Sequence, residues 1–206
     1  MTTRLLLATR NAKKLEELRR ILLKRGLGEV EVLGLSDVDE FPEAPETGAT
    51  FEENALAKAH DAALATGLPA IADDSGLSVD ALSGMPGVLS ARWAGEHGDD
   101  TANLQLVLGQ LRDTPDERRG ASFVCAAALV VPDREEIVVR GDWRGTIIRE
   151  PRGANGFGYD PIFVPEGETR TSAELAPSEK DSVSHRGRAL RALLPHLREL
   201  VEAQAG

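Results

Sequence analysis

Several common classes of site and of protein are excluded by what this sequence of 206 residues lacks. It has one cysteine, Cys125, so neither an intramolecular disulfide nor a multi-cysteine zinc site can form, and the apolar neighbours of Cys125 predict a core position. Aromatic residues make up only 4% of the chain, which predicts a mainly aliphatic core. No apolar run reaches the roughly 18 residues of a membrane span, and no signal peptide is recognisable. We therefore expect a cytoplasmic protein without membrane partners.

Positive charge is also in short supply. The formal net charge is -10 and the isoelectric point is near 5.0. A field of this sign repels polyanions, so we expect no nucleic-acid partner. A nucleotide substrate would need a local basic pocket. The GxxxxGK and GxGxxG phosphate-binding loops are both absent.

The periodicity of apolar residues predicts a single α/β domain over residues 1–206 with a mixed sheet, because helical patterns alternate with both parallel-type and hairpin strands. No repeat or linker divides the chain. Asn11 and Thr50 are expected helix N-caps, and Gly26 and Gly67 expected helix stops. The expected strands are Arg4–Thr9, Pro69–Ala72 ending in a turn at Asp73–Gly76, a returning strand Leu77–Leu82, and a hairpin around Pro132–Asp133. The expected helices are 12–25, Phe51–Thr66, Asp100–Arg112 and a C-terminal helix that Pro195 either kinks or divides.

The first candidate site is the segment Thr9-Arg10-Asn11-Ala12-Lys13-Lys14, in which a strand leads into a helix. The unpaired N–H groups and the dipole of a helix N-terminus favour an anion, and lysines beside it suit phosphate. The alternative is a pair of solvated surface lysines.

Three carboxylates form the second candidate site. Asp73 and Asp74 are adjacent at the expected strand end, and Glu46 lies upstream. Adjacent carboxylates repel unless a cation or hydrogen bonds compensate them, and oxygen ligands suit a hard divalent ion, so this set suggests magnesium. An acidic turn that caps local N–H groups is the alternative.

Two further segments carry candidate binding residues. In GFGYDPIF, glycines place Phe157 and Tyr159 in a turn, where either ring can stack on a base or, alternatively, be buried. In SEKDSVSHRG, the residues Lys180, His185 and Arg186 cluster at the start of the last helix. Cations there oppose the helix dipole, which a bound anion or keto oxygen would explain; an ordinary surface cluster is the alternative.

Taken together, ATRNAKK, FEENALAKA, IADDSGLSVDAL, SARWAG, GFGYDPIF and SEKDSVSHRG resemble the inosine triphosphate pyrophosphatase family, the dITP/XTP pyrophosphatases. The resemblance extends from Leu6 to about Leu194. It implies an elongated α/β fold with a long mixed sheet and a cleft between two lobes, usually in a homodimer.

The resemblance also implies roles for individual residues. It places catalysis at Asp74 and metal binding at Asp74 and Glu46, although Glu52 and Glu53 are close enough to compete with Glu46. Arg10 stands where the family often has glycine, and Lys13 adds a second lysine beside Lys14. The substrate-binding residues that it implies are Thr9, Arg10, Asn11, Ala12, Lys13, Lys14, Lys58, Ser75, Phe157, Gly158, Tyr159, Asp160, Lys180, His185 and Arg186.

The expected reaction is magnesium-dependent hydrolysis of ITP, dITP or XTP to the monophosphate and pyrophosphate, which would cleanse the nucleotide pool. Two other functions stay open on the sequence. One is a Maf-like pyrophosphatase that prefers pyrimidine or modified nucleotides. The other is a regulator that binds ITP without hydrolysing it, in which the carboxylates would be structural.

Overall fold

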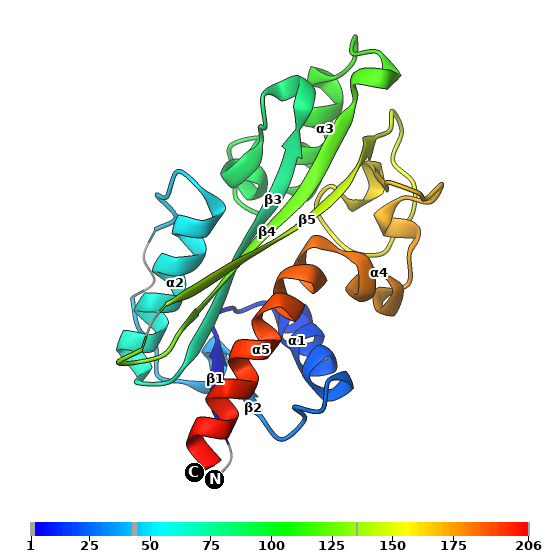
Figure 1. Cartoon of the computed structure of the whole chain (residues 1–206). Helices are drawn as coiled ribbons and strands as arrows, with labels where there is room; N and C mark the ends of the chain where they lie inside the picture. Colours follow the sequence, from blue (N-terminus) through cyan, green and yellow to red (C-terminus); the bar gives the residue numbers. More distant parts are fainter. Residues whose placement is uncertain (1–2, 43–44, 135, 206) are drawn as a thin grey trace. The chain divides into compact units, whose positions relative to one another are not determined.

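The computed structural model describes residues 3–42, 45–134 and 136–205 and shows an α/β protein (Figure 1). Six strands form one sheet in the order β2-β1-β3-β4-β5-β6. The strands are β1 (Arg4–Leu7), β2 (Glu31–Leu33), β3 (Ala70–Val79), β4 (Gly120–Val130), β5 (Ile137–Ile147) and β6 (Phe163–Pro165), and the helices are α1 (Ala12–Lys24), α2 (Phe51–Thr66), α3 (Asp100–Gln110), α4 (Pro177–Val183) and α5 (His185–Ala205).

The sheet is mixed, as predicted. Strand β1 pairs in parallel with both β2 and β3, whereas β5 pairs antiparallel with β6. Parallel neighbours need a crossover connection, and α1 supplies it between β1 and β2. Strands β4 and β5 are neighbours, and Asp133 adopts a positive φ of 62° in the connection between them.

The chain divides into two compact units. Unit 1 comprises the described residues of Met1–Asp74, Ala126–Arg140 and Gly187–Gly206, and unit 2 comprises Ser75–Cys125 and Gly141–Arg186. In unit 1, α2 lies on one side of the strands, and α1 and α5 lie on the other (Figure 1). Both faces of this part of the sheet are therefore covered by helices, as expected for parallel strands.

The predicted helix ends are confirmed. The Asn11 side chain accepts hydrogen bonds from the backbone of the first turn of α1, and the Thr50 side chain accepts one from the Glu53 N–H of α2. Gly67 ends α2 in the left-handed conformation at φ 68°, which costs glycine little. The C-terminal helix α5 contains Pro195 within it, so the proposed division into two segments is wrong.

The expected turn at Asp73–Gly76 is also wrong. Residues Ala70–Val79 form one continuous strand, and the segment predicted to return is the second half of that strand followed by a short 3-10 helix at Asp80–Leu82. Aspartate, serine and glycine favour turns in isolation. Here the segment lies in the middle of β3, which pairs with β1 at Ala70 and Ile71 and has β4 as its other neighbour, so it continues as a strand.

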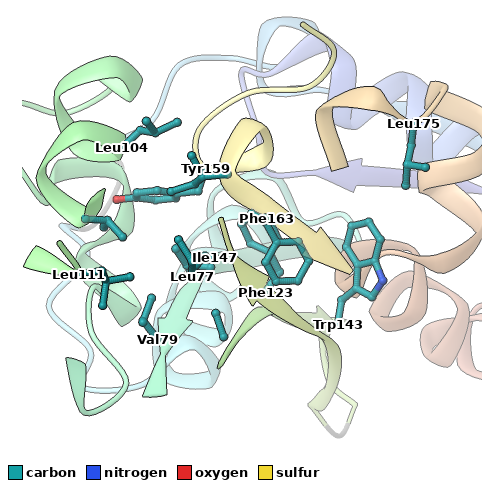
Figure 2. Close-up of a cluster of buried hydrophobic side chains, with 13 residues drawn as sticks. Leu77, Val79, Leu104, Leu111, Phe123, Trp143, Ile147, Tyr159, Phe163 and Leu175 are labelled. Atoms are coloured by element: carbon teal, nitrogen blue, oxygen red, sulfur yellow. The ribbon is translucent and has the colours of Figure 1, made fainter. Parts of the chain in front are cut away.

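Unit 2 has an aromatic and aliphatic core of its own (Figure 2). Side chains of β3, α3, β4, β5 and β6 meet in it, and Tyr159 lies among Leu77, Leu104 and Leu111. Cys125 is buried in β4, as predicted. In the part of the chain that the structure describes, no helix is long and apolar enough to cross a membrane.

Candidate functional site

Unit 1 contains a cluster of five charged side chains, Lys14, Glu46, Lys58, Asp73 and Asp74, which we call the carboxylate–lysine cluster. Successive residues of a strand point to opposite faces of its sheet. Because β3 is continuous, Asp73 and Asp74 point to opposite faces and meet different helices. The Lys14 ammonium of α1 lies 2.7 Å from an Asp73 oxygen, and the Lys58 ammonium of α2 lies 3.7 Å from an Asp74 oxygen.

Asp74 is held by two residues of α2 that lie one helical turn apart. Asn54 Nδ2 donates a hydrogen bond of 3.0 Å to Asp74 Oδ2, while Asn54 Oδ1 accepts one of 2.8 Å from the Gly48 N–H. Lys58 Nζ also donates to Glu46 at 2.8 Å. The Lys58 ammonium therefore contacts both Glu46 and Asp74, the two carboxylates that the family resemblance implies as metal ligands.

Burial shifts the proton affinities in this cluster. Desolvation raises the pKa of Asp74 above its ordinary value, and the opposing effects of Lys58 and the Asn54 hydrogen bond do not cancel it. Burial alone would lower the pKa of the Lys58 ammonium, but Asp74 and Glu46 outweigh it, and that pKa is raised. Asp74 thus binds a proton more readily than an exposed aspartate, beside an ammonium that stays charged.

The expectation that Asp73, Asp74 and Glu46 gather around one cation is not met. Asp73 lies on the opposite face of β3, and within the described ranges no group of three or more His, Cys, Asp or Glu side chains could hold a metal ion. Glu46 and Asp74 remain together. Magnesium is commonly held by only one or two carboxylates plus substrate phosphates, so this hard-oxygen pair fits that mode of binding.

The two glutamates that compete with Glu46 have other partners. Glu52 pairs with Arg140 at 3.1 Å, and Glu53 accepts a hydrogen bond of 2.6 Å from the Ala49 N–H at the start of α2. Of these three glutamates, Glu46 alone contacts Lys58, the lysine that also lies beside Asp74, among the contacts that the structure describes.

The predicted phosphate segment is largely capped by its own side chains. Thr9 Oγ1 accepts from the Asn11 N–H, and Asn11 Oδ1 accepts from the N–H groups of Lys13 and Lys14. The backbone N–H groups there are thus less available to an anion than the sequence suggested, and the Lys14 ammonium is the main charged group that is positioned. Arg10 and Lys13 are exposed, and Arg10 lies 3.8 Å from Glu40.

A second group of candidate residues lies in unit 2, in the segment Gly156–Asp160, which we call the Phe157 loop. Asp160 is buried and accepts hydrogen bonds from the Phe157 N–H, Ser172 and Lys180. A Cβ on Gly156 would clash with Asp160 Oδ2, and the φ of +75° at Gly156 disfavours other residues. Gly158 donates its N–H to Asp100 at 2.8 Å. These contacts fix a loop on which Phe157 is 54% exposed.

Of the two aromatic rings proposed to stack on a base, only Phe157 is available. Tyr159 is buried in the core of unit 2, and its hydroxyl donates to the Ser90 carbonyl at 2.7 Å (Figure 2). Burial raises the pKa of the Tyr159 hydroxyl. Its role is packing, so its assignment as a stacking residue is wrong. The Lys180 ammonium lies 5.4 Å from the centre of the Phe157 ring, within the range of a cation–π contact.

The C-terminal cations do not share one helix. Lys180 belongs to the separate helix α4 and pairs with Asp160, whereas His185 and Arg186 begin α5. The His185 ring stacks on Phe123, with centroids 4.9 Å apart and planes 13° apart. Arg186 is 5% exposed. The imidazole orientation is therefore set by β4, not by the helix alone.

Sequence reasoning missed Asn54, Asp100 and Phe123. Asn54 and Lys58 have the i, i+4 spacing that places two side chains on one face of a helix, so the pair was detectable once Lys58 was a candidate. Asp100 and Phe123 lie far along the chain from the groups that they hold, and no local pattern connects them. Ser75 follows Asp74 in β3 and is partly buried, and its substrate-binding role stays a prediction from the family resemblance.

Comparison with known proteins shows the family. The model of the Ham1 family matches residues 5–196. A dITP/XTP pyrophosphatase of Nocardia farcinica is 67% identical over 199 residues, 97% of either chain, and one of Mycobacterium tuberculosis H37Rv is 65% identical over 200 residues, 97% of this chain and 98% of its own.

Solved structures agree with this result. A nucleoside-triphosphatase / dITP/XTP pyrophosphatase of Mycobacterium abscessus is 64% identical, with a TM-score of 0.78 over 95% of this chain and 100% of its own. A HAM1 protein of Coxiella burnetii is 46% identical, with a TM-score of 0.87 over 96% and 99%. The family resemblance predicted from the motifs is confirmed, and the chain belongs to the Ham1 family.

Proposed function

We propose that this protein hydrolyses non-standard purine nucleoside triphosphates, namely ITP, dITP and XTP, to the monophosphate and pyrophosphate. The observation that carries the proposal is the carboxylate–lysine cluster, in which a buried carboxylate of raised pKa lies beside positioned ammonium groups. Relatives about two thirds identical over nearly the whole chain carry the name dITP/XTP pyrophosphatase. Such an enzyme would remove these nucleotides before their incorporation into DNA or RNA.

The chemistry assigned to the cluster needs no covalent intermediate. Asp74 accepts a proton from the attacking water, a task that its raised pKa favours and for which Asn54 and Lys58 orient it. Lys58 places positive charge beside Asp74, where a phosphate chain would gain negative charge, and Lys14 supplies a second ammonium beside the neighbouring residue Asp73. Phosphoryl transfer depends mainly on positioning and charge neutralisation, and this set supplies both.

Magnesium is the proposed cofactor, held by Glu46 and Asp74 together with substrate oxygens. When bound, it would neutralise phosphate charge and polarise the phosphorus under attack. The Lys58 ammonium lies 2.8 Å from a Glu46 oxygen and 3.7 Å from an Asp74 oxygen, and this shared cation supports the choice of these two carboxylates. Asp73 is left out of this assignment because Lys14 holds it on the other face of β3.

Base selection is proposed for the Phe157 loop and the start of α5. Phe157 offers an exposed ring for stacking on the purine. His185 and Arg186 are proposed to donate hydrogen bonds to a 6-keto oxygen. Adenine carries a 6-amino donor at that position, so its complex would leave buried donors unpaired at a cost of about 1–3 kcal/mol each.

A substrate panel tests the function directly. Pyrophosphate release is measured for ITP, dITP, XTP, GTP, ATP, dUTP and dTTP, with magnesium and then with excess chelator. We expect fast release from the first three, and loss of all release on chelation. Preference for a pyrimidine nucleotide would contradict the substrate proposal, and binding of ITP without pyrophosphate release would contradict the enzymatic one.

The position of attack is tested by hydrolysis of ITP in H₂¹⁸O. We expect water to attack the α phosphorus, so that the bond to the β phosphate breaks and the label enters IMP. Label in pyrophosphate would place the attack on the β phosphorus. The homodimer and the cytoplasmic location stay predictions, for which sedimentation equilibrium and cell fractionation are the measurements.

A further inference from the structure

An arginine-rich pocket lies in unit 2, lined by residues of α3 and of the segments that follow α3 and β5. Its volume is about 350 Å³, within the lower range for small-molecule pockets. No acidic residue is found among the described residues that line it, although the chain has a net charge of -10. The lining residues, which define the arginine pocket, are Gln105, Leu108, Gly109, Arg112, Arg119 and Arg149.

Arg119 is the buried member of the pocket, at 2% exposure. Its guanidinium donates to the carbonyls of Leu111 at 2.6 Å, Ile147 at 2.8 Å and Ile148 at 3.3 Å. Carbonyls satisfy hydrogen bonds but carry no net charge. The charge of Asp116 favours the charged form of Arg119 through space, but it does not outweigh the effects of burial and of Arg149, which lower the pKa of Arg119. With a longer bond of 3.5 Å to the Thr114 carbonyl, these contacts use four of the five N–H groups, fix the guanidinium in one orientation and leave one N–H for a ligand.

The other two arginines add charge to the same pocket. Arg149 is paired with Asp116 at 2.7 Å and donates to the carbonyls of Arg112 and Thr114. For the Arg112 guanidinium, the described part of the chain provides no ion pair. Burial, and next the charge of Arg149, lower the pKa of Arg119, as expected where like charges approach each other. Three guanidinium groups thus face one carboxylate.

We propose that the arginine pocket binds a small oxyanion of the phosphate class, such as inorganic phosphate or pyrophosphate. The planar guanidinium of Arg112 can bind two oxygens of phosphate with paired hydrogen bonds, and the negative charge of a bound anion would favour the charged form of Arg119. A purely structural role explains the bonds of Arg119 and Arg149, but not why the Arg112 guanidinium, for which the described residues provide no ion pair, lines the same pocket. None of these residues belongs to the carboxylate–lysine cluster or the Phe157 loop, so the proposal stands apart from the proposed function.

Nuclear magnetic resonance tests the pocket without any turnover. The Nε–Hε signals of Arg119 and Arg149 and the amide signal of Gly109 are followed in ¹⁵N-labelled full-length protein. Sodium phosphate and sodium pyrophosphate are the titrants, and sodium chloride of equal ionic strength is the reference. We expect saturable shifts with at least one phosphate-class anion and none with chloride; the relative affinities separate inorganic phosphate from pyrophosphate.

A pair of matched variants distinguishes the pocket from general charge. Arg112→Gln removes a lining guanidinium that makes no hydrogen bond or ion pair with the residues that the structure describes. Arg118→Gln makes the same charge change at an exposed neighbouring arginine outside the pocket. We expect at least a fivefold loss of affinity in Arg112→Gln and less than a twofold loss in Arg118→Gln.

Three results would overturn the proposal. The first is a set of shifts that do not saturate or that chloride reproduces. The second is an equal loss of affinity in the two variants. The third is the absence of NMR shifts with either anion, combined with weaker self-association of Arg112→Gln in sedimentation equilibrium. In that case a carboxylate of a second copy of the chain would be the ligand.

Discussion

Asn54 gives the sharpest test of the carboxylate–lysine cluster, through the substitution Asn54→Leu. The side chain is buried at 3% exposure and makes two hydrogen bonds, one to the Asp74 carboxylate and one from the Gly48 N–H. Leucine has a similar size and makes neither. A matched control is Asn103→Leu, because Asn103 is equally buried at 2% and also makes two hydrogen bonds, both to backbone groups.

The expected losses differ because only one of the two asparagines serves a charged group. Two neutral hydrogen bonds are worth about 1–3 kcal/mol, whereas a bond to a charged group is worth about 1.5–3 kcal/mol by itself. Near pH 8, Asn54→Leu should therefore lower the free energy of unfolding by about 1 kcal/mol more than Asn103→Leu does. In the ITP assay, kcat/KM should fall at least tenfold for Asn54→Leu and less than threefold for Asn103→Leu.

The pH dependence separates the proposed role from simple loss of packing. Burial raises the pKa of Asp74, and the Asn54 hydrogen bond opposes that rise, so Asn54→Leu should raise the pKa further. A group whose pKa is raised on folding contributes its stability at low pH and loses it as the pH rises through the folded pKa. The extra destabilisation by Asn54→Leu should therefore disappear as the pH falls through that raised pKa.

The measurement is urea unfolding followed by circular dichroism between pH 4 and pH 8, with chelator present to keep the protein free of metal. The quantity of interest is the difference in unfolding free energy between the two variants at each pH. A difference that stays constant with pH would refute the assignment of Asn54 as the residue that stabilises the charged form of Asp74.

Four further substitutions test the proposed roles. Asp74→Asn should nearly abolish pyrophosphate release with the fold intact by circular dichroism; retention of more than about a tenth of the activity, a loss of only about 1.4 kcal/mol, would be incompatible with its role. Lys14→Ala should weaken ITP binding more than IMP binding in calorimetry, and equal losses would place Lys14 away from the phosphate chain. Phe157→Ala should raise KM for ITP more than Phe157→Leu does, and a similar KM in both variants would argue against stacking. Arg186→Ala should reduce the ratio of kcat/KM for ITP over ATP by about tenfold or more, about 1.4 kcal/mol; because this ratio does not depend on the folded fraction, parallel losses would exclude base reading by Arg186.

Local patterns in the sequence were sufficient for the helix ends and for the class of fold. Asn11, Thr50 and Gly67 act within one turn of their own positions, so capping and the left-handed stop could be read from neighbouring residues. The motifs were likewise sufficient for the family, which the Ham1 match confirms. The site roles carried over with the family are predictions that the substitutions above test.

The strand β3 marks where local reasoning failed. Asp73 to Gly76 has the composition of a turn, yet it lies in the middle of a ten-residue strand. The strand has neighbours on both sides in the sheet, and lysines from helices on its two faces pair with its two carboxylates. Neither feature can be predicted from the residues next to Asp73 and Asp74 in the sequence. The prediction that Tyr159 stacks on a base was wrong for a similar reason, because the burial of Tyr159 depends on α3 and β3 and not on its own loop.

The sequence by itself determined which chemical groups this protein has and where several helices begin and end, because capping depends on residues within a turn of one another. Only the tertiary structure decided which of these groups contact one another and which are buried. It separated Asp73 from Asp74 on opposite faces of one strand, gave Asp74 to Asn54 and Lys58, and buried Tyr159 while leaving Phe157 exposed. The physical reason is that burial and charge pairing depend on which distant segments pack together.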